Sequence, residues 1–439
     1  MTAPLLKAVG RYLDKQRERL HMPGHKGVLP APLAGCAPFD VTELPDTGCL
    51  YDGEGAPTET ETVFTQLYNS GATLLSAGGS TLCIQAMLSL FCPEGSTLLM
   101  GRTSHHAAVN AAALLNLTPV WLYPDTVSGI QTPGRISPQA VQSALKANPD
   151  VTAVYLTSPD YFGTLCDIPA IATIAHAHGK PLLVDNAHGA HLAFFDGLHP
   201  MAQGADACCD SLHKTLPALT GAALLHLKDA ALAQEARRRM AAFGSTSPSY
   251  LIMLSADMLL PRWQTLKHDF NTLARQVASL HAQAKAKGVW ATECTDSALY
   301  DPVRIALAFP VGGKNAARTQ LDALSIEAEY LSARHIVLIP APQSRLSRVH
   351  DLISALPALD EANRLPQSGA TPRQAMPLRR AVLALAERLP VSEAIGRTAS
   401  VPVAPCPPGV ALLMPGEVLD DQTAKLLYAT GIENLFVVK

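Results

Sequence analysis

Short apolar runs alternate with amphipathic stretches between Thr60 and Lys228. Turn residues bound the runs, and helical stretches with polar flanks, such as Ser80–Phe91 and Ile168–His178, separate them. Apolar runs spaced by helices are typical of βα units, whose parallel strands are covered on both faces. The pattern therefore predicts an α/β fold with a mostly parallel sheet. The predicted strands are Thr97–Met100, Val120–Tyr123, Ala153–Thr157, Leu182–Asp185, Ala205–Asp210 and Ala222–Leu227.

The N-terminal segment follows a helical period. Apolar residues recur at near-helical spacing from Leu5 to Leu20 and predict an amphipathic helix there. The next stretch, His21–Ala56, is rich in Gly, Pro and Asp, and this composition predicts an irregular arm.

The C-terminal part of the chain has a different pattern. A long predicted helix, Pro261–Lys287, leads to the strand-like segments Val303–Phe309 and Ile336–Pro340, which indicates a smaller α+β domain. The polar, proline-containing segment Pro357–Leu378 is a linker candidate. We expect an N-terminal helix and arm over residues 1–56, a large domain over 57–265 and a small α+β domain over 266–439.

Composition narrows the class of protein. The chain has 439 residues, of which 48% are hydrophobic, and a formal net charge of -3, which suits a compact enzyme and disfavours nucleic-acid binding. No apolar window reaches the roughly 18 residues of a membrane span. The nine cysteines form no CxxC pair, which favours reduced thiols in the cytoplasm. Without HExxH or a Cys/His cluster of metal-binding spacing, we expect no catalytic metal.

Two ionisable residues follow apolar runs that are predicted to be strands. Leu182–Asp185 ends in an acid, and Lys214 comes shortly after Ala205–Asp210. Ligands of open α/β sheets bind beyond the carboxyl ends of strands, so Asp185 and Lys214 are placed to meet one. Alone, Asp185 would be a helix cap and Lys214 a surface lysine. Together they supply what pyridoxal phosphate (PLP) needs, an amine for its aldehyde and an acid for its pyridine nitrogen.

The segment Ser76–Thr81 predicts a phosphate cradle. Gly79, Ser80 and Thr81 precede a helical stretch, where glycines admit a close approach and the first helical amides point at an anion. Such a sequence is more often only a helix cap, but Ser211 and His213 beside Lys214 strengthen the interpretation. Either His105 or His106 is placed after a strand, where an imidazole can stack on a flat cofactor or lie at the surface.

Six ordered motifs resemble those of the Orn/Lys/Arg decarboxylase family of fold-type I PLP enzymes, and the resemblance runs through nearly the whole chain. The motifs are His21-Met-Pro-Gly-His-Lys-Gly27, Asp40-Val-Thr-Glu-Leu44, Leu50-Tyr-Asp-Gly-Glu-Gly-Ala-Pro57, Ser211-Leu-His-Lys-Thr215, Ser245-Thr-Ser-Pro-Ser-Tyr250, and Pro407-Pro-Gly-Val410 with Pro415-Gly-Glu417. The resemblance implies PLP as cofactor and α-decarboxylation of lysine, arginine or ornithine. Asn186 departs from the pattern, because many relatives have an acid there.

The resemblance also implies roles for single residues. Lys214 would be the Schiff-base lysine, Asp185 the partner of the pyridine nitrogen, His105 the residue on the ring face and His188 the residue near the ring edge. Ser80, Ser211 and His213 would hold the phosphate, with Thr246 reaching in from the second subunit of an obligate homodimer.

The cofactor residues do not choose the reaction. An aminotransferase or lyase of the same fold and a catalytically silent PLP-binding paralogue remain alternatives. A basic substrate needs an acidic partner for its distal cation, since an unpaired buried cation is costly. The acids that qualify are Asp46, Asp52, Glu329 and Glu417.

Overall fold

A computed structural model describes residues 1–125, 134–291, 299–310, 312–359, 371–404 and 410–439. The chain forms two compact units, each made of two separate stretches: residues 1–91 with 181–268, and residues 92–180 with 269–439. Most of the motif Pro407–Val410 and much of the linker candidate Pro357–Leu378 lie outside the described residues.

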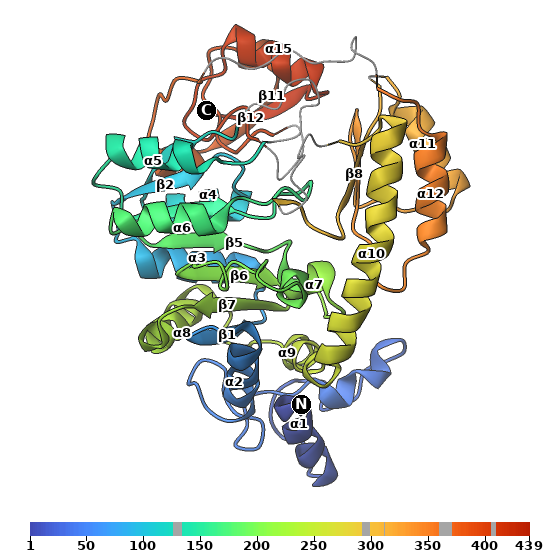
Figure 1. Cartoon of the computed structure of the whole chain (residues 1–439). Helices are drawn as coiled ribbons and strands as arrows, with labels where there is room; N and C mark the ends of the chain where they lie inside the picture. Colours follow the sequence, from blue (N-terminus) through green and yellow to red (C-terminus); the bar gives the residue numbers. More distant parts are fainter. Residues whose placement is uncertain (126–133, 292–298, 311, 360–370, 405–409) are drawn as a thin grey trace. The chain divides into compact units, whose positions relative to one another are not determined.

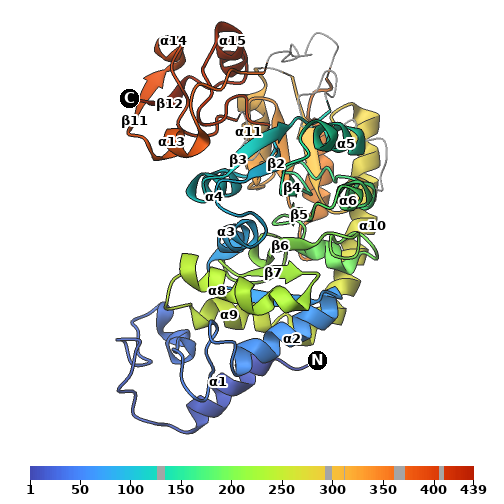
Figure 2. The same ribbon diagram turned by 90° about the vertical axis from the view of Figure 1, so that its left-hand side faces the viewer.

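The first unit contains four strands of the large sheet. Their order is β1-β7-β6-β5; β5 and β6 are parallel, and β7 is antiparallel to both β6 and β1. Helix α3 packs against β6 and β7, and α8 packs against α3 (Figure 2). The elements are α1 Pro4–Asp14, α2 Ala56–Tyr68, β1 Ala72–Ser76, α3 Gly79–Phe91, β5 Leu182–Asp185, β6 Ala207–Ser211, α7 Leu212–Thr215, β7 Ala223–Leu227, α8 Ala233–Phe243 and α9 Tyr250–Asp257.

The second unit holds the other strands of this seven-stranded sheet and two small antiparallel sheets (Figure 1). Strand β2 is parallel to both β4 and β3. The small sheets have the orders β8-β10-β9 and β11-β12. The elements are β2 Thr97–Gly101, α4 His106–Leu114, β3 Thr118–Leu122, α5 Pro138–Ala147, β4 Ala153–Thr157, α6 Ile168–Ala177, β8 Ile305–Ala308, α11 Lys314–Ala323, β9 Tyr330–Leu331, β10 His335–Leu338, α12 Leu346–Ala355, α13 Leu378–Leu383, β11 Ala386–Pro390, α14 Val391–Ala394, α15 Asp421–Ala429 and β12 Asn434–Val438. Helix α10, Trp263–Lys287, begins in the first unit and continues into the second.

The predicted fold class is confirmed: a mostly parallel α/β sheet with a smaller part built on antiparallel sheets. Every residue of β4, β5 and β6 is buried, as their mainly apolar sequences predict. The predicted N-terminal helix extends too far, because α1 ends at Asp14 and Leu20 is 86% exposed. Gln16 has a φ of 47°, a left-handed conformation that cannot continue a right-handed helix. None of the described helices is both long enough and apolar enough to cross a membrane.

Candidate functional site

Lys214 and His188 meet in the first unit. Lys214 lies in the short helix α7 directly after β6, and His188 lies in the turn after β5. Lys214 Nζ is 3.0 Å from His188 Nε2, within hydrogen-bonding distance. The strands β5 and β6 are parallel neighbours, so their carboxyl ends bring both side chains to the same edge of the sheet. Asp185 ends β5 at this same edge, and its joint role with Lys214 stays a prediction.

Asp185 ends β5 and is only 2% exposed. Its Oδ1 accepts a hydrogen bond from the backbone amide of Ala187 at 3.1 Å and faces the Cys209 Sγ at 3.7 Å. These contacts fix the carboxylate at the end of the strand, as the sequence predicts. A buried carboxylate in this position suits a partner that is protonated, since an acid–cation hydrogen bond is stronger than a neutral one.

The candidate donors for a phosphate lie at the start of α3 and at the end of β6. Gly79 has a φ of 68°, and a Cβ built there meets nothing within 4 Å, so the backbone borders open space. The Ser211 hydroxyl donates to Ser80 Oγ at 2.8 Å, which joins the end of β6 to this helix. Thr81, in the first helical turn, is exposed. Two hydroxyls and the first amides of a helix beside a lysine form a donor set that fits the phosphate of PLP.

Two further residues are predicted from the sequence to bind the phosphate, His213 in α7 and Thr246 after α8. His213 is half-buried, and its Nδ1 is 3.2 Å from the Ala222 carbonyl oxygen. Burial lowers the pKa of its imidazole, and the neighbouring Lys214 lowers it further. Thr246 is exposed in the loop between α8 and α9. The role of each as a phosphate ligand stays a prediction.

His105 and His106 belong to the second unit, at the start of α4. His105 caps this helix, because its Nδ1 accepts the Ala107 amide at 3.1 Å. That bond places the ring proton of a neutral His105 on Nε2. The two imidazoles have ring centroids 3.8 Å apart, and His106 is the exposed one.

The acids proposed for a substrate cation have different surroundings. Glu417 is 2% exposed and bound by Arg102 through two hydrogen bonds of 2.7 and 2.6 Å, so its charge is already paired. Asp46 pairs with Lys15, and Asp52 is exposed. Glu329 is exposed, precedes β9 and accepts the Tyr161 hydroxyl at 3.0 Å.

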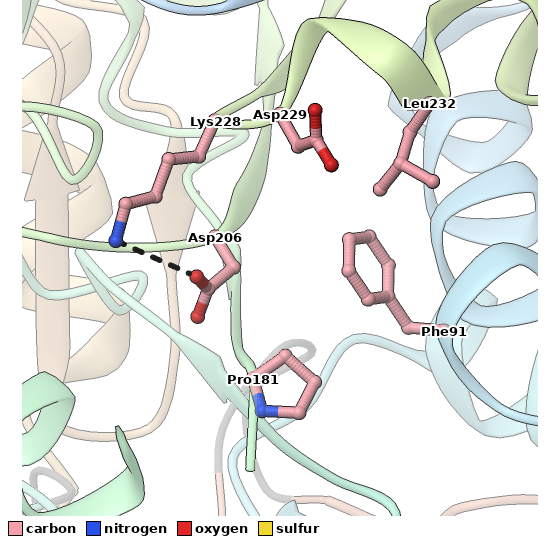
Figure 3. A pocket seen from close by; sticks show the side chains of 6 residues that line it. All are labelled: Phe91, Pro181, Asp206, Lys228, Asp229 and Leu232. Carbon is pink, nitrogen blue, oxygen red and sulfur yellow. Dashed lines mark ion pairs between the residues drawn. The ribbon is translucent and has the colours of Figure 1, made fainter. Parts of the chain in front are cut away.

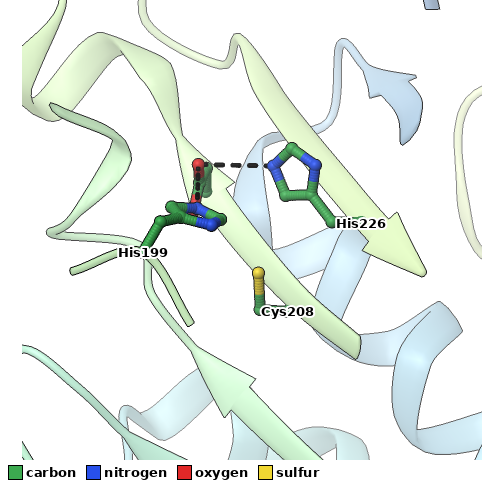
Figure 4. A group of neighbouring side chains, drawn as sticks. His199, Cys208 and His226 are labelled. Atoms are coloured by element: carbon green, nitrogen blue, oxygen red, sulfur yellow. Dashed lines mark hydrogen bonds and ion pairs between the residues drawn. The ribbon is translucent and has the colours of Figure 1, made fainter. Parts of the chain in front are cut away.

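One buried network was not predicted from the sequence. Asp210 accepts hydrogen bonds from Asn186, His199 and His226. Cys208 lies beside the two histidines (Figure 4). The irregular spacing of these residues carries no motif. Only the pairing of β6 with β7 brings His226 beside this strand, where it lies opposite Cys208.

The cavity in Figure 3 belongs to the opposite edge of the sheet. Pro181 and Asp206 precede β5 and β6, and Lys228 follows the antiparallel β7, so all three lie at the amino ends of the parallel strands. Lys228 Nζ is 3.7 Å from Asp206 Oδ1 there. The residues that line the cavity are Phe91, Pro181, Asp206, Lys228, Asp229 and Leu232. This cavity is therefore separate from the candidate site.

Comparisons with known proteins agree with the motifs. The family model "Orn/Lys/Arg decarboxylase, major domain" matches residues 3–294, and the model of the C-terminal domain of the same family matches residues 358–434. The uncharacterized protein YaaO of Bacillus subtilis is 29% identical over 97% of this chain and 94% of its own length. An arginine decarboxylase of Bacillus subtilis is 24% identical over 97% of this chain and 93% of its own length.

A solved structure shares the fold. The constitutive lysine decarboxylase of Escherichia coli superimposes with a TM-score of 0.80 over 100% of this chain and 82% of that chain, at 18% sequence identity.

Proposed function

The chain belongs to the Orn/Lys/Arg decarboxylase family of PLP-dependent enzymes, and from this premise we propose that it decarboxylates a basic amino acid, with lysine or arginine ahead of ornithine. The observation that carries the proposal is the pairing of Lys214 with His188 at the edge of the sheet where Asp185 ends β5. Relatives named as arginine and lysine decarboxylases support the choice of substrates.

Each site residue has a task in this proposal. When bound, PLP supplies an electron-withdrawing ring that stabilises negative charge at the substrate carbon. Lys214 binds the cofactor aldehyde, and Asp185 holds the proton on the pyridine nitrogen. Ser80 and Ser211, with the first amides of α3, bind the phosphate. His188 holds or moves a proton at Lys214 Nζ, since the two nitrogens are 3.0 Å apart.

The distal cation of the substrate requires an acid, and Glu329 is our candidate. Glu417 is occupied by Arg102, whereas Glu329 has an exposed carboxylate that the Tyr161 hydroxyl orients. Tyr161 is itself held by an edge-to-face contact with Tyr330, at 5.8 Å between ring centroids. A carboxylate oriented by a neutral donor keeps its charge available for a cation.

We further propose a homodimer in which Thr246 contributes to the phosphate site of the other subunit, and a cytoplasmic location. The exposure of Thr246 supports the first point. All seven cysteines in the described part of the chain are free thiols, which suits a reducing compartment.

Release of carbon dioxide from a panel of amino acids tests the proposal. Lysine, arginine or ornithine should yield carbon dioxide and the corresponding amine, and Lys214→Ala should abolish both turnover and the visible absorption of the lysine-linked cofactor. Norleucine, which matches lysine in length but lacks the cation, is the control. Equal turnover of norleucine contradicts a basic substrate, and a keto acid product identifies an aminotransferase instead.

Neutralising the acid tests the substrate contact separately. Glu329→Gln should raise the KM for the basic substrate more than tenfold, about 1.4 kcal/mol, without changing cofactor binding. Glu327→Gln is the matched control, because Glu327 is an exposed acid two residues away that pairs with Arg318 at 3.6 Å. The same KM change in both variants would show a general charge effect.

A further inference from the structure

Asp210 is a buried carboxylate to which the proposed reaction assigns no task. It is the fourth residue of β6, is 0% exposed, and lies directly before Ser211. Asn186 Nδ2 donates to its Oδ1 at 2.6 Å. Nε2 of His199 and of His226 lie 3.1 and 3.3 Å from its Oδ2. A carboxylate removed from water in this way is retained only when such donors satisfy it.

The carboxyl of Asp210 is ionised, and the ring nitrogen through which His226 donates to it can be assigned. Burial raises the pKa of this carboxyl, but the contacts with His199 and His226 outweigh burial and hold the pKa below its usual value. Burial lowers the pKa of His226 despite the nearby carboxylate. His226 is therefore a neutral donor at neutral pH, and its Nδ1 is satisfied by the Thr73 hydroxyl at 2.8 Å.

The same hydrogen bonds decide between a network and a metal site. The ligand atoms of His199, Cys208, Asp210 and His226 lie within 4.8 Å of one another. A metal ion would need the lone pair of His199 Nε2, which leaves the ring proton on Nδ1. Yet Nδ1 of His199 faces the amide N–H of Met201 at 3.4 Å, a donor. Nδ1 therefore accepts, Nε2 donates to Asp210, and the hydrogen-bonded network is favoured.

The network joins the two strand ends of the cofactor site. Asn186 directly follows Asp185, and its backbone amide donates to the Cys209 carbonyl oxygen at 3.0 Å. The Asn186 carbonyl oxygen then accepts the Gly189 amide at 2.7 Å and closes the turn that contains His188. A Cβ at Gly189 would lie 2.0 Å from Asn186 Oδ1, so the turn packs directly on this amide side chain.

We propose that Asp210 is a positioning residue of the PLP site: by holding the side chain of Asn186, it fixes the orientation of Asp185 and His188 with respect to Lys214. The inference rests on the proposed cofactor role of Asp185 and Lys214.

The inference also explains why this chain has Asn186 where many relatives have an acid. Two carboxylates 2.6 Å apart in a buried site would not both stay ionised, whereas an amide donates to Asp210.

Cofactor release from the holoenzyme, followed by its visible absorption, tests the inference without any substrate. Asn186→Ala and Asp210→Asn should each speed PLP release about tenfold or more, as expected for loss of a hydrogen bond to a charged group. In an Asp185→Asn background the same changes should alter release less than about threefold, because the carboxylate that they position is already neutral. Asp206→Asn is the control, an acid at the other end of β6.

The outcomes separate the alternatives. Equal effects in both backgrounds, with matching losses of thermal stability, would reduce Asp210 to a structural residue and overturn the inference. About one equivalent of metal in the purified holoenzyme, lost in Asp210→Asn, would replace the network by a metal site. If Asp210→Asn does not fold, Asn186→Ala decides alone. Failure of carbon dioxide release would refute the proposed function and leave this result standing.

Discussion

At the scale of single residues, His105 differs from His106 because only the His105 side chain is described as accepting a hydrogen bond that caps α4. The Nδ1 of His105 caps α4, so its ring is oriented by the backbone, while His106 is exposed. We expect His105→Ala to speed PLP release and lower the melting temperature, since loss of a cap costs about 1 kcal/mol. His106→Ala should change both less. Absorbance at the cofactor band and thermal unfolding measure the two effects.

A conservative variant separates the two roles of His105. Asparagine caps helices well but has no ring to stack on a cofactor. His105→Asn should therefore keep the melting temperature and still lose the cofactor faster. If its PLP release equals that of the wild type, the cap alone explains the alanine variant and the ring has no part in binding.

Sequence patterns find residues that end a strand, but not residues that meet across strands. Asp185 and Lys214 follow apolar runs, so their edge of the sheet was predictable. The link from Asp210 to His226 depends on how β6 pairs with β7. The donor at Asn186 was visible only as a departure from the family pattern.

At the scale of elements, an ion pair fastens the end of β2 to the C-terminal segment within the second unit. Arg102 follows β2 and donates to Glu417, and its Nε also donates to the Ala411 carbonyl oxygen at 2.8 Å. Both charges are buried, at 1% and 2% exposure. We expect Glu417→Leu to lower the free energy of unfolding by about 3–5 kcal/mol, because it leaves Arg102 buried without its counter-charge. Urea unfolding measures this loss.

A double variant shows where the cost arises. Arg102→Met with Glu417→Leu removes both charges and should be more stable than Glu417→Leu alone, since no unpaired charge remains. A double variant less stable than either single variant would mean that the carbonyl contacts of Arg102, rather than its charge, carry the stabilisation.

Helices and strands were predictable from the sequence where the length of a segment or the residues beside it distinguish a helix from a strand. Helix α10 and the buried strands agree with the predicted segments within a few residues. The direction of β7 was not predictable, because an apolar run reads the same for parallel and antiparallel strands. Its neighbour β1 was absent from the predicted strands; its sequence, Ala72–Ser76, is short and stands close to the glycines before α3.

At the scale of the whole molecule, the proposed homodimer predicts complementation. Lys214→Ala and a bulky replacement such as Thr246→Trp should each be inactive. In an equal mixture that exchanges subunits, half of the dimers are mixed, and each mixed dimer has one site with both residues intact, so activity should return to about a quarter of the wild-type value. Decarboxylation assays of the mixture measure the recovery. No recovery after proven exchange would place Thr246 outside the site.

Labelling at a cysteine can show whether the subunits exchange. Cys36 is exposed in the N-terminal arm, while the other six are half-buried or buried. Burial raises the pKa of Cys49, Cys83, Cys92, Cys166, Cys208 and Cys209, and a protonated thiol reacts slowly with electrophiles. A maleimide dye should therefore favour Cys36 over these six. Donor- and acceptor-labelled pools would then report subunit mixing as fluorescence energy transfer before any activity returns.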